Sequence, residues 1–329
     1  MKKILITGAS GFVGGYLVTE ALSRNYDVYA GIRKSSSKIY LDDPRIQFLY
    51  LNYADKESLK KQLSQEKFDY IIHNAGITKA NDLEGYLKVN TTYVKNLVES
   101  LIEVNSIPEK FIYVSSLAAV GPGDHNPDLL IRDDSPTRPV TYYGESKLAA
   151  EKFLESITTF PYIILRPTAV YGPREKDLLT VFKMINKGLD IRIGVKNQKL
   201  SFIYVEDLAK LMLDAAVSNH KQKAYVVSDS QVYSGNLLND YIKEALGKKA
   251  VTISIPVSVL SIIASVSGFV SRLSGKVSVL NKNKVNEIKC QSWAVDAAGI
   301  KEDFNFAPSY FLREGIKRTA DWYNKNNWL

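Results

Sequence analysis

Short runs of β-branched and aromatic residues alternate with longer amphipathic stretches through the first two thirds of the chain. Apolar runs of this length, separated by helical patterns, are typical of strands in a parallel sheet whose two faces are both covered. The pattern therefore predicts an α/β fold with a doubly wound parallel sheet. The strand-like runs are 3–8, 27–33, 46–52, 68–76, 110–116 and 162–167, with helical patterns such as 55–65 and 86–104 between most of them.

This alternation loosens after residues 171–173. One further strand-like run follows at 223–230, and the last third of the chain is mostly helical with loops. A chain of 329 residues is long enough to form two coupled lobes, each with its own core. We expect the two lobes to be interleaved, with a cleft between them. The larger would comprise residues 1–170 and 201–228, and the smaller, mostly helical one residues 171–200 and 229–329.

One segment is nearly long enough and apolar enough to span a bilayer. Residues Thr252 to Ser271 carry no charge. Serines lie on a separate helical face, however, and Pro256 suits the first turn of a helix. We therefore predict an amphipathic helix that covers the core or the substrate, and no integral membrane span; interfacial membrane contact is the minor alternative. The apolar stripe consists of Val259, Ile263, Val266, Val270 and Leu273.

Composition limits the possible partners. The net charge is +8, but the basic residues are spread along the chain without a block, so we expect no nucleic-acid binding. An anionic cofactor or substrate accounts for positive potential equally well. The single cysteine, Cys290, excludes a disulfide within the chain and favours a cytoplasmic location. The scattered histidines His73, His125 and His220, without a Cys/His cluster, predict no metal site.

A glycine-rich turn follows the first strand-like run and opens a helical pattern. Gly8, Gly11 and Gly14 recur at three-residue intervals. Glycine allows a tight turn, close approach of a pyrophosphate and close helix–strand packing, and the helix N-terminus supplies amide donors. The turn thus predicts a dinucleotide site; a glycine-rich turn without a ligand is the alternative. The predicted contact residues are Gly8, Ser10, Gly11, Phe12, Val13 and Gly14.

The end of the second strand-like run indicates which dinucleotide binds. An acidic residue there would hold the ribose hydroxyls of NAD. The stretch "VYAGIRKSSSKIYL" contains no acid and instead carries Arg33 and Lys34, which could pair with a 2′-phosphate. This favours NADP(H), with NAD(H) possible. A solvated basic loop is the alternative.

Two adjacent tyrosines precede a lysine in "YYGESK". Tyr143 and Lys147 lie four residues apart and share a helix face, whereas Tyr142 points elsewhere. A phenol with an ordinary pKa of about 10 is a poor base at neutral pH, and a nearby ammonium lowers that pKa. The pair is therefore a candidate acid/base group. An ordinary amphipathic helix, with Tyr143 as a packing residue, is the alternative.

Six motifs occur along the chain in a fixed order: "TGASGFVG", "HNAG", "YVSS", "YYGESK", "LRPTAVYGP" and "FIYVEDLA". In this order and spacing they resemble the extended short-chain dehydrogenase/reductases, the NAD(P)-dependent epimerase/dehydratase family. The resemblance extends from Lys2 to about Asp207 and continues more weakly to the C-terminus. It implies a Rossmann-type sheet, cofactor binding by the larger lobe and binding of a small-molecule substrate by the smaller lobe.

Carried over residue by residue, the resemblance implies that Ser116, Tyr143 and Lys147 are catalytic. Ser116 would polarise the substrate oxygen, and Lys147 would also hold the nicotinamide ribose. The family usually has Asp where this chain has Asn52, so that contact is altered. The resemblance implies further cofactor contacts at Asn52 and Tyr53 near the adenine, at Asn74, Ala75 and Gly76 along the cofactor path, at Asn90 for positioning or contact, and from Pro167 to Val170 on the nicotinamide side.

Branches of this family differ at positions that can be compared here. Leu117 and Ala118 follow Ser116 where sugar-nucleotide dehydratases have Asp-Glu, so a dehydratase is not expected. Ala169 and Leu200 stand where epimerases have the Asn and Arg of a diphosphate clamp. These differences favour the hydroxysteroid-dehydrogenase and dihydroflavonol-reductase side of the family, which transfers hydride between nicotinamide and a secondary alcohol or ketone.

We therefore expect an oxidoreductase acting on a largely apolar substrate. A sugar-nucleotide epimerase with an atypical diphosphate clamp is one alternative, and a non-catalytic dinucleotide-sensing protein is another. Many relatives dimerise through two helices of the cofactor lobe, one of which carries the Tyr/Lys pair. A homodimer is accordingly expected.

Overall fold

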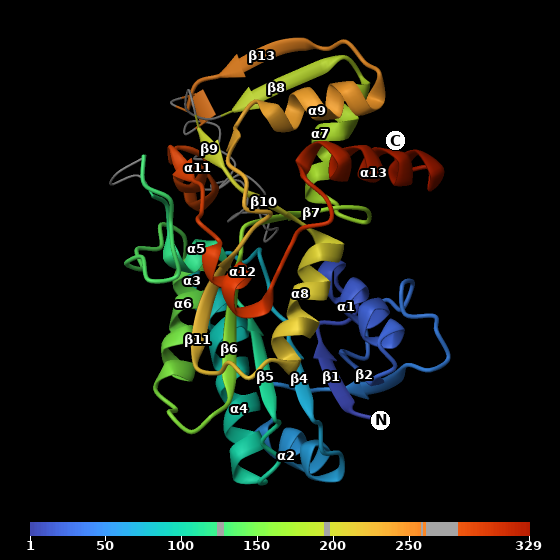
Figure 1. The fold of residues 1–329 in the computed structure, drawn as a ribbon, viewed down its shortest axis with the longest axis vertical. Helices are drawn as coiled ribbons and strands as arrows, with labels where there is room; N and C mark the ends of the chain where they lie inside the picture. The colour runs from blue at the N-terminus through green and yellow to red at the C-terminus, as the bar shows by residue number, and fades with distance from the viewer. Residues whose placement is uncertain (124–127, 194–197, 258, 261–281) are drawn as a thin grey trace.

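A seven-stranded parallel sheet forms the larger part of the protein (Figure 1). The computed structural model spans residues 1–329 and describes all of them except 124–127, 194–197, 258 and 261–281. Among the described residues, the strand order is β11-β6-β5-β4-β1-β2-β3. Every pairing in this sheet is parallel, so the carboxyl ends of the strands meet at one edge. The strands are β1 (Lys3–Thr7), β2 (Asp27–Ile32), β3 (Gln47–Tyr50), β4 (Tyr70–His73), β5 (Lys110–Val114), β6 (Tyr162–Pro167) and β11 (Lys223–Val227).

Helices cover both faces of this sheet, which is why its central strands are apolar throughout. Alternate residues of β1 enter opposite cores: Ile4 and Ile6 pack on one face and Leu5 on the other. One face is covered by α1 (Phe12–Ser23), α8 (Val205–Val217) and α12 (Ala298–Phe304). The other is covered by α2 (Lys56–Gln65), α4 (Tyr93–Glu103) and α6 (Tyr142–Glu155).

The remaining elements lie mostly beyond the carboxyl edge of the sheet (Figure 1). Buried aromatic residues such as Tyr171, Phe182 and Tyr323 form a separate core there. In the described part of the chain three small sheets accompany it, with orders β10-β7, β12-β9-β14 and β13-β8. Their strands are β7 (Ala169–Tyr171), β8 (Leu189–Ile193), β9 (Lys199–Leu200), β10 (Phe202–Tyr204), β12 (Tyr233–Ser234), β13 (Val251–Ile255) and β14 (Ser292–Trp293). The helices are α7 (Asp177–Asn186), α9 (Leu237–Leu246), α11 (Lys282–Ile288) and α13 (Leu312–Lys325).

The predicted fold class is confirmed. All seven strands of the main sheet fall within the predicted runs, and β11 joins that sheet although it follows β7 to β10 in the chain. The last third was expected to be mostly helical with loops, and besides its helices it contains the short strands β12, β13 and β14, which the sequence analysis did not identify. Strands of two to five residues leave too little periodicity to be separated from loops. The exact division into two lobes stays a prediction.

The uncharged segment Thr252 to Ser271 begins as a strand, because β13 extends to Ile255. Val257, Val259 and Leu260 are helical, as expected after Pro256, and the rest of the predicted helix lies outside the described residues. In the ranges that the structure describes, no helix is long and apolar enough to cross a membrane. In the same ranges, no three His, Cys, Asp or Glu side chains gather as a metal site would require.

Candidate active site

Close backbone contacts require glycine in the turn after β1. Gly8 has a φ of +67°, and a Cβ added to it would lie 2.8 Å from the backbone nitrogen of Ala75. A Cβ on Gly14 would lie 2.1 Å from the backbone oxygen of Gly8. The Gly11 amide donates to that same oxygen at 3.0 Å, and α1 begins one residue later. The first turn of α1, all of whose residues the structure describes, carries no acidic side chain. This backbone cradle at a helix N-terminus fits a dinucleotide pyrophosphate. The turn residues Ser10, Phe12 and Val13 are partly buried beside it.

The loop after β4 lies against this turn. The strand register sets Thr7 beside His73, whose Nδ1 is 3.0 Å from Thr7 Oγ1. That hydroxyl oxygen accepts a hydrogen bond from the Ala75 amide at 3.2 Å. Burial, together with the ammonium of Lys147, lowers the pKa of His73 to about 3, so the ring is neutral. His73 therefore supports the predicted cofactor loop, a role that the sequence analysis did not assign to it.

Asn90 lies in a short π-helix, η1 (Lys88–Thr92), between α3 (Leu83–Leu87) and α4. Its side chain is fully buried, and Nδ2 donates to the Ile77 carbonyl and to Ser146 Oγ, both at 3.0 Å. Its Oδ1 accepts from the Ile77 amide at 2.9 Å. These bonds join the loop after β4 to helix α6, and single π-turns of this kind are frequent at functional sites. Of the two roles expected for Asn90, the geometry favours positioning.

Ser116 and Tyr143 come together because α5 (Leu117–Val120) and α6 pack closely. A Cβ on Gly144 would lie 2.1 Å from the Ala118 oxygen, so glycine is needed at this crossing. Ser116 caps α5 and accepts from the Ala118 amide at 3.2 Å. Burial raises the pKa of Tyr143 to about 12, against the opposing effect of a hydrogen bond with the Ser116 side chain. Burial thus outweighs the lowering of the pKa expected from Lys147, and Tyr143 is a protonated phenol at neutral pH.

Lys147 lies one turn further along α6 and is almost completely buried. Its Nζ donates to the Val114 carbonyl at 2.8 Å and lies 4.9 Å from the centre of the Tyr113 ring. A Cβ on Gly76 would lie 3.4 Å from the same nitrogen. Burial lowers the pKa of Lys147 to about 8, and the carboxylate of Glu151 opposes this. The ammonium thus faces the cofactor loop, in the position implied for a residue that binds the nicotinamide ribose.

Glu151 anchors a buried polar network beneath this lysine. Its carboxylate is fully buried, accepts from Ser115 Oγ and pairs with Arg166, whose Nη2 lies 2.8 Å from Oε2. Arg166 Nη1 also donates to the Asp133 carbonyl at 3.1 Å. The sequence analysis missed this network. The available signal was the spacing of Glu151, which follows Lys147 by four residues on the same helix face.

The basic residues expected to select the cofactor lie at the end of β2. Arg33 and Lys34 are exposed, and a turn is held by the Arg33 amide, which donates to Ser36 Oγ at 3.1 Å. Asn52 is exposed after β3. Tyr53 instead packs into the protein, edge-on to His73 at 5.9 Å. All four follow strands of the parallel sheet and so lie at its carboxyl edge, the usual position of ligands in such folds.

The two positions that differ from a diphosphate clamp lie in the small sheets. Ala169 is exposed at the start of β7, between the buried Pro167 and the partly buried Val170. Leu200 is partly buried and packs on the core that contains Phe202. Neither of these apolar side chains offers a hydrogen-bond donor to a phosphate.

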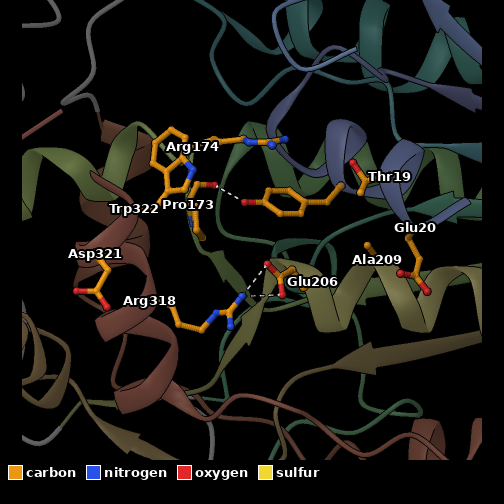
Figure 2. A pocket seen from close by; sticks show the side chains of 10 residues that line it. Thr19, Glu20, Pro173, Arg174, Glu206, Ala209, Arg318, Asp321 and Trp322 are labelled. Atoms are coloured by element: carbon orange, nitrogen blue, oxygen red, sulfur yellow. Dashed lines mark hydrogen bonds and ion pairs between the residues drawn. The ribbon is translucent and has the colours of Figure 1, made fainter. Parts of the chain in front are cut away.

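A pocket of about 520 Å³ lies elsewhere, between α1, α8 and α13 (Figure 2). Arg318 faces Glu206 across it at 3.4 Å, and the guanidinium of Arg174 lies 4.8 Å from the centre of the Tyr16 ring. None of the predicted site residues lines this pocket. It is therefore separate from the Ser116, Tyr143 and Lys147 cluster.

Comparison with known proteins assigns the chain to a family. The model of the NAD dependent epimerase/dehydratase family matches residues 4–228. The chain therefore belongs to the NAD-dependent epimerase/dehydratase family, whose members include the extended short-chain dehydrogenase/reductases named by the resemblance.

Individual relatives extend the match over almost the whole chain. A putative UDP-glucose 4-epimerase of Methanocaldococcus jannaschii is 26% identical, with 98% of this chain and 99% of that protein covered. A ceramide reductase of Caulobacter vibrioides is 25% identical, with 99% and 96% covered. A solved structure of a UDP-glucose 4-epimerase from Thermotoga maritima with UDP-glucose has a TM-score of 0.80 at 20% identity, with 99% of both chains covered. The protein thus belongs to a family of enzymes, and its relatives include both epimerases and a reductase.

Proposed function

We propose that this protein is an NAD(P)(H)-dependent oxidoreductase that transfers hydride between nicotinamide and a secondary alcohol or ketone of a largely apolar substrate. The observation that carries the proposal is the contact of Tyr143 with Ser116, with Lys147 one turn further along α6 and facing the loop that lies against the glycine turn. The cofactor would supply or accept the hydride. The residues of the chain would orient the substrate and move the proton.

Each side chain suits one part of that task. Ser116 Oγ already accepts from the Ala118 amide, so its hydroxyl hydrogen can be donated to a substrate oxygen. In carbonyl reduction that oxygen gains negative charge and needs a proton, which the Tyr143 phenol holds at neutral pH. The Lys147 ammonium would stabilise the phenolate that results. In alcohol oxidation the same proton would return to Tyr143.

The substrate class follows from what the clamp positions lack. A diphosphate needs several charge-assisted donors, and Ala169 and Leu200 supply none. The ceramide reductase among the relatives supports reduction of an apolar substrate. The names of the epimerase relatives favour a second candidate, a sugar-nucleotide epimerase whose diphosphate is held by other groups. A dinucleotide-sensing protein without turnover is the third.

The decisive variant is Tyr143→Phe, and the chain offers a matched control. Tyr142 is the neighbouring tyrosine and is 40% exposed. With cyclic ketones and NAD(P)H, we expect Tyr143→Phe to lower kcat by about 10²- to 10⁴-fold, the usual contribution of a positioned acid/base, and Tyr142→Phe to leave kcat within a few-fold. An equal effect of the two variants would contradict the assignment of Tyr143.

Activity and binding measurements on the wild-type protein distinguish the three candidate functions. Ketone-dependent oxidation of NAD(P)H supports the oxidoreductase. Interconversion of UDP-sugars, with NAD retained through purification, replaces it with the epimerase. Dinucleotide binding without turnover on ketones, alcohols or UDP-sugars replaces it with the sensing protein.

Cofactor preference is part of the proposal. Because Arg33 and Lys34 are exposed at the end of β2 and no acid is present, we propose that NADPH binds more tightly than NADH. Loss of a charge-assisted hydrogen bond of about 1.5–3 kcal/mol predicts that Arg33→Ala raises the Kd for NADPH at least tenfold and that for NADH little. The matched control is Lys38→Ala, because the Lys38 ammonium lies 3.8 Å from the centre of the Phe48 ring instead. An equal loss of both cofactors in Arg33→Ala would contradict the preference.

A further inference from the structure

The parallel pair β8 and β13 has its aliphatic side chains outside and its charged side chains inside. The strand register pairs Leu189 with Val251 and Ile191 with Ile253. Because side chains alternate along a strand, these residues share one face. Leu189 is 41% exposed, Val251 68% and Ile253 46%. A sheet that packs on a helix ordinarily buries such residues.

The opposite face is fixed by a buried carboxylate. Asp190 has no exposed surface and accepts from Arg192 at 2.9 Å, from Asn239 at 2.7 Å and from Lys243 at 3.1 Å. Asn239 and Lys243 belong to α9, so the polar face is held against that helix. The Thr252 hydroxyl of β13 donates to the same carboxylate at 3.2 Å. A one-residue slip of either strand would break these bonds, and the aliphatic face is therefore held outward.

Basic residues gather at one end of this face. The two strands are parallel, and the Val251 amide donates to the Gly188 carbonyl at 2.9 Å, so the segments that lead into them are neighbours. Lys187, Lys248 and Lys249 lie in those segments and are exposed. The sequence contains no acidic residue at 178–189 or at 245–255. An aliphatic surface with lysines and no acidic residue in the described segments that lead into its strands, in a chain of net charge +8, complements a surface that is apolar inside and anionic outside.

We propose that this β8/β13 face docks the protein on a lipid bilayer that carries anionic headgroups. The aliphatic residues would enter the boundary between headgroups and acyl chains while the lysines bind the headgroups. A second copy of the chain fits less well, because the described residues of β8, β13 and the segments that lead into them place no acid on this face to pair with a partner's lysines. Two five-residue strands also cover only about 16 Å by 10 Å, less than a standard protein interface of about 800 Å² per partner. The inference does not depend on the substrate.

Flotation with vesicles tests the proposal on the full chain. We expect binding to mixed phosphatidylcholine and phosphatidylglycerol vesicles, weakening with salt, and little binding to phosphatidylcholine alone. Val251→Ser with Ile253→Ser should weaken binding at least tenfold, since each CH₂ group that no longer enters the lipid lowers the binding constant about fourfold. The triple change Lys187→Gln, Lys248→Gln and Lys249→Gln should weaken it about 10²-fold, at about fivefold per lysine.

Matched controls carry the same changes elsewhere on the surface. Val217 is 50% exposed and Ile107 43%, so Val217→Ser with Ile107→Ser removes comparable apolar surface. Lys61→Gln, Lys67→Gln and Lys317→Gln give the same net charge as the test triple and alter exposed lysines. Both control variants should float like the wild type. Circular dichroism melts verify folding, and the lysine triple decides the matter if the serine variant unfolds.

Three results would overturn the proposal. The first is a wild-type protein that does not float with the mixed vesicles. The second is an equal loss of flotation in test and control variants, which would mean that net charge alone drives binding. The third is a dimer in sedimentation velocity that the serine variant of β13 converts to monomer, which would mean that a second copy covers this face.

Discussion

Replacing Lys147 with methionine should remove a specific pH dependence of stability. The unfolded chain holds the lysine proton up to a pKa of about 10.5, whereas burial lowers the pKa in the folded protein to about 8. Between these values the unfolded state binds more protons, so the stability of the wild type rises with pH across the interval. Relative to the neutral amine, the lysine costs about 3 kcal/mol at pH 7 and about 1 kcal/mol at pH 9.5. The methionine variant lacks this titration.

Urea unfolding of the cofactor-free protein at the two pH values measures the effect. The stability difference between wild type and Lys147→Met should move in favour of the wild type by about 2 kcal/mol on going from pH 7 to pH 9.5. The difference between the hydrogen bonds that the charged and the neutral amine donate to the Val114 carbonyl is already part of the pKa shift, and losses that do not depend on pH cancel. Lys152→Met, an exposed position on the same helix, should show no such change. A wild-type-to-variant difference that stays constant, or that moves in the other direction, would refute the reasoning.

Two further substitutions test the surroundings of the site, each against a neighbouring control. Glu151→Gln leaves the buried guanidinium of Arg166 without its carboxylate and should lower the free energy of unfolding in urea by about 3–5 kcal/mol. The control Glu155→Gln changes an exposed side chain and should lower it by less than about 0.5 kcal/mol. Similar losses in both variants would contradict the buried ion pair. Gly14→Ala places a methyl group 2.1 Å from a backbone oxygen and should abolish NADH fluorescence enhancement, whereas a Cβ on Gly15 meets its nearest atom at 3.5 Å and Gly15→Ala should preserve it. Retained NADH binding in Gly14→Ala would argue against the cradle.

The sequence predicts the main sheet well because its central strands are buried on both faces. Such strands are continuous apolar runs, and the helices between them show their own periodicity. The glycine turn and the tyrosine–lysine pair can also be predicted from the sequence, because their residues lie close together along the chain. The residues that support them cannot be predicted in this way. Thr7 contacts His73 only because β1 pairs with β4, and Glu151 contacts Arg166 only because α6 packs on β6.

The small sheets show the opposite case. In β8 the alternation of Leu189, Asp190 and Ile191 indicates a strand with one apolar face, and the ordinary expectation is that this face is buried. In the structure the polar face is buried instead, because Asp190 accepts hydrogen bonds from Asn239 and Lys243 of α9. Which face of a short amphipathic strand turns inward depends on residues about 50 positions away, and no local pattern contains that information.

The position of β11 has a consequence for the protein during its synthesis. β6 ends at Pro167 and its partner β5 precedes it in the chain, but its other edge can be covered only when β11, which begins at Lys223, has been made. At about 5–20 residues per second, a ribosome needs roughly 3–11 s to produce the chain between them. During that time a strand that is fully buried in the finished protein presents unpaired backbone groups, the arrangement that invites pairing with another chain. The nascent protein is thus most exposed to misassembly just after the proposed catalytic residues have been synthesised, and a chaperone that shields strand edges would act in this interval.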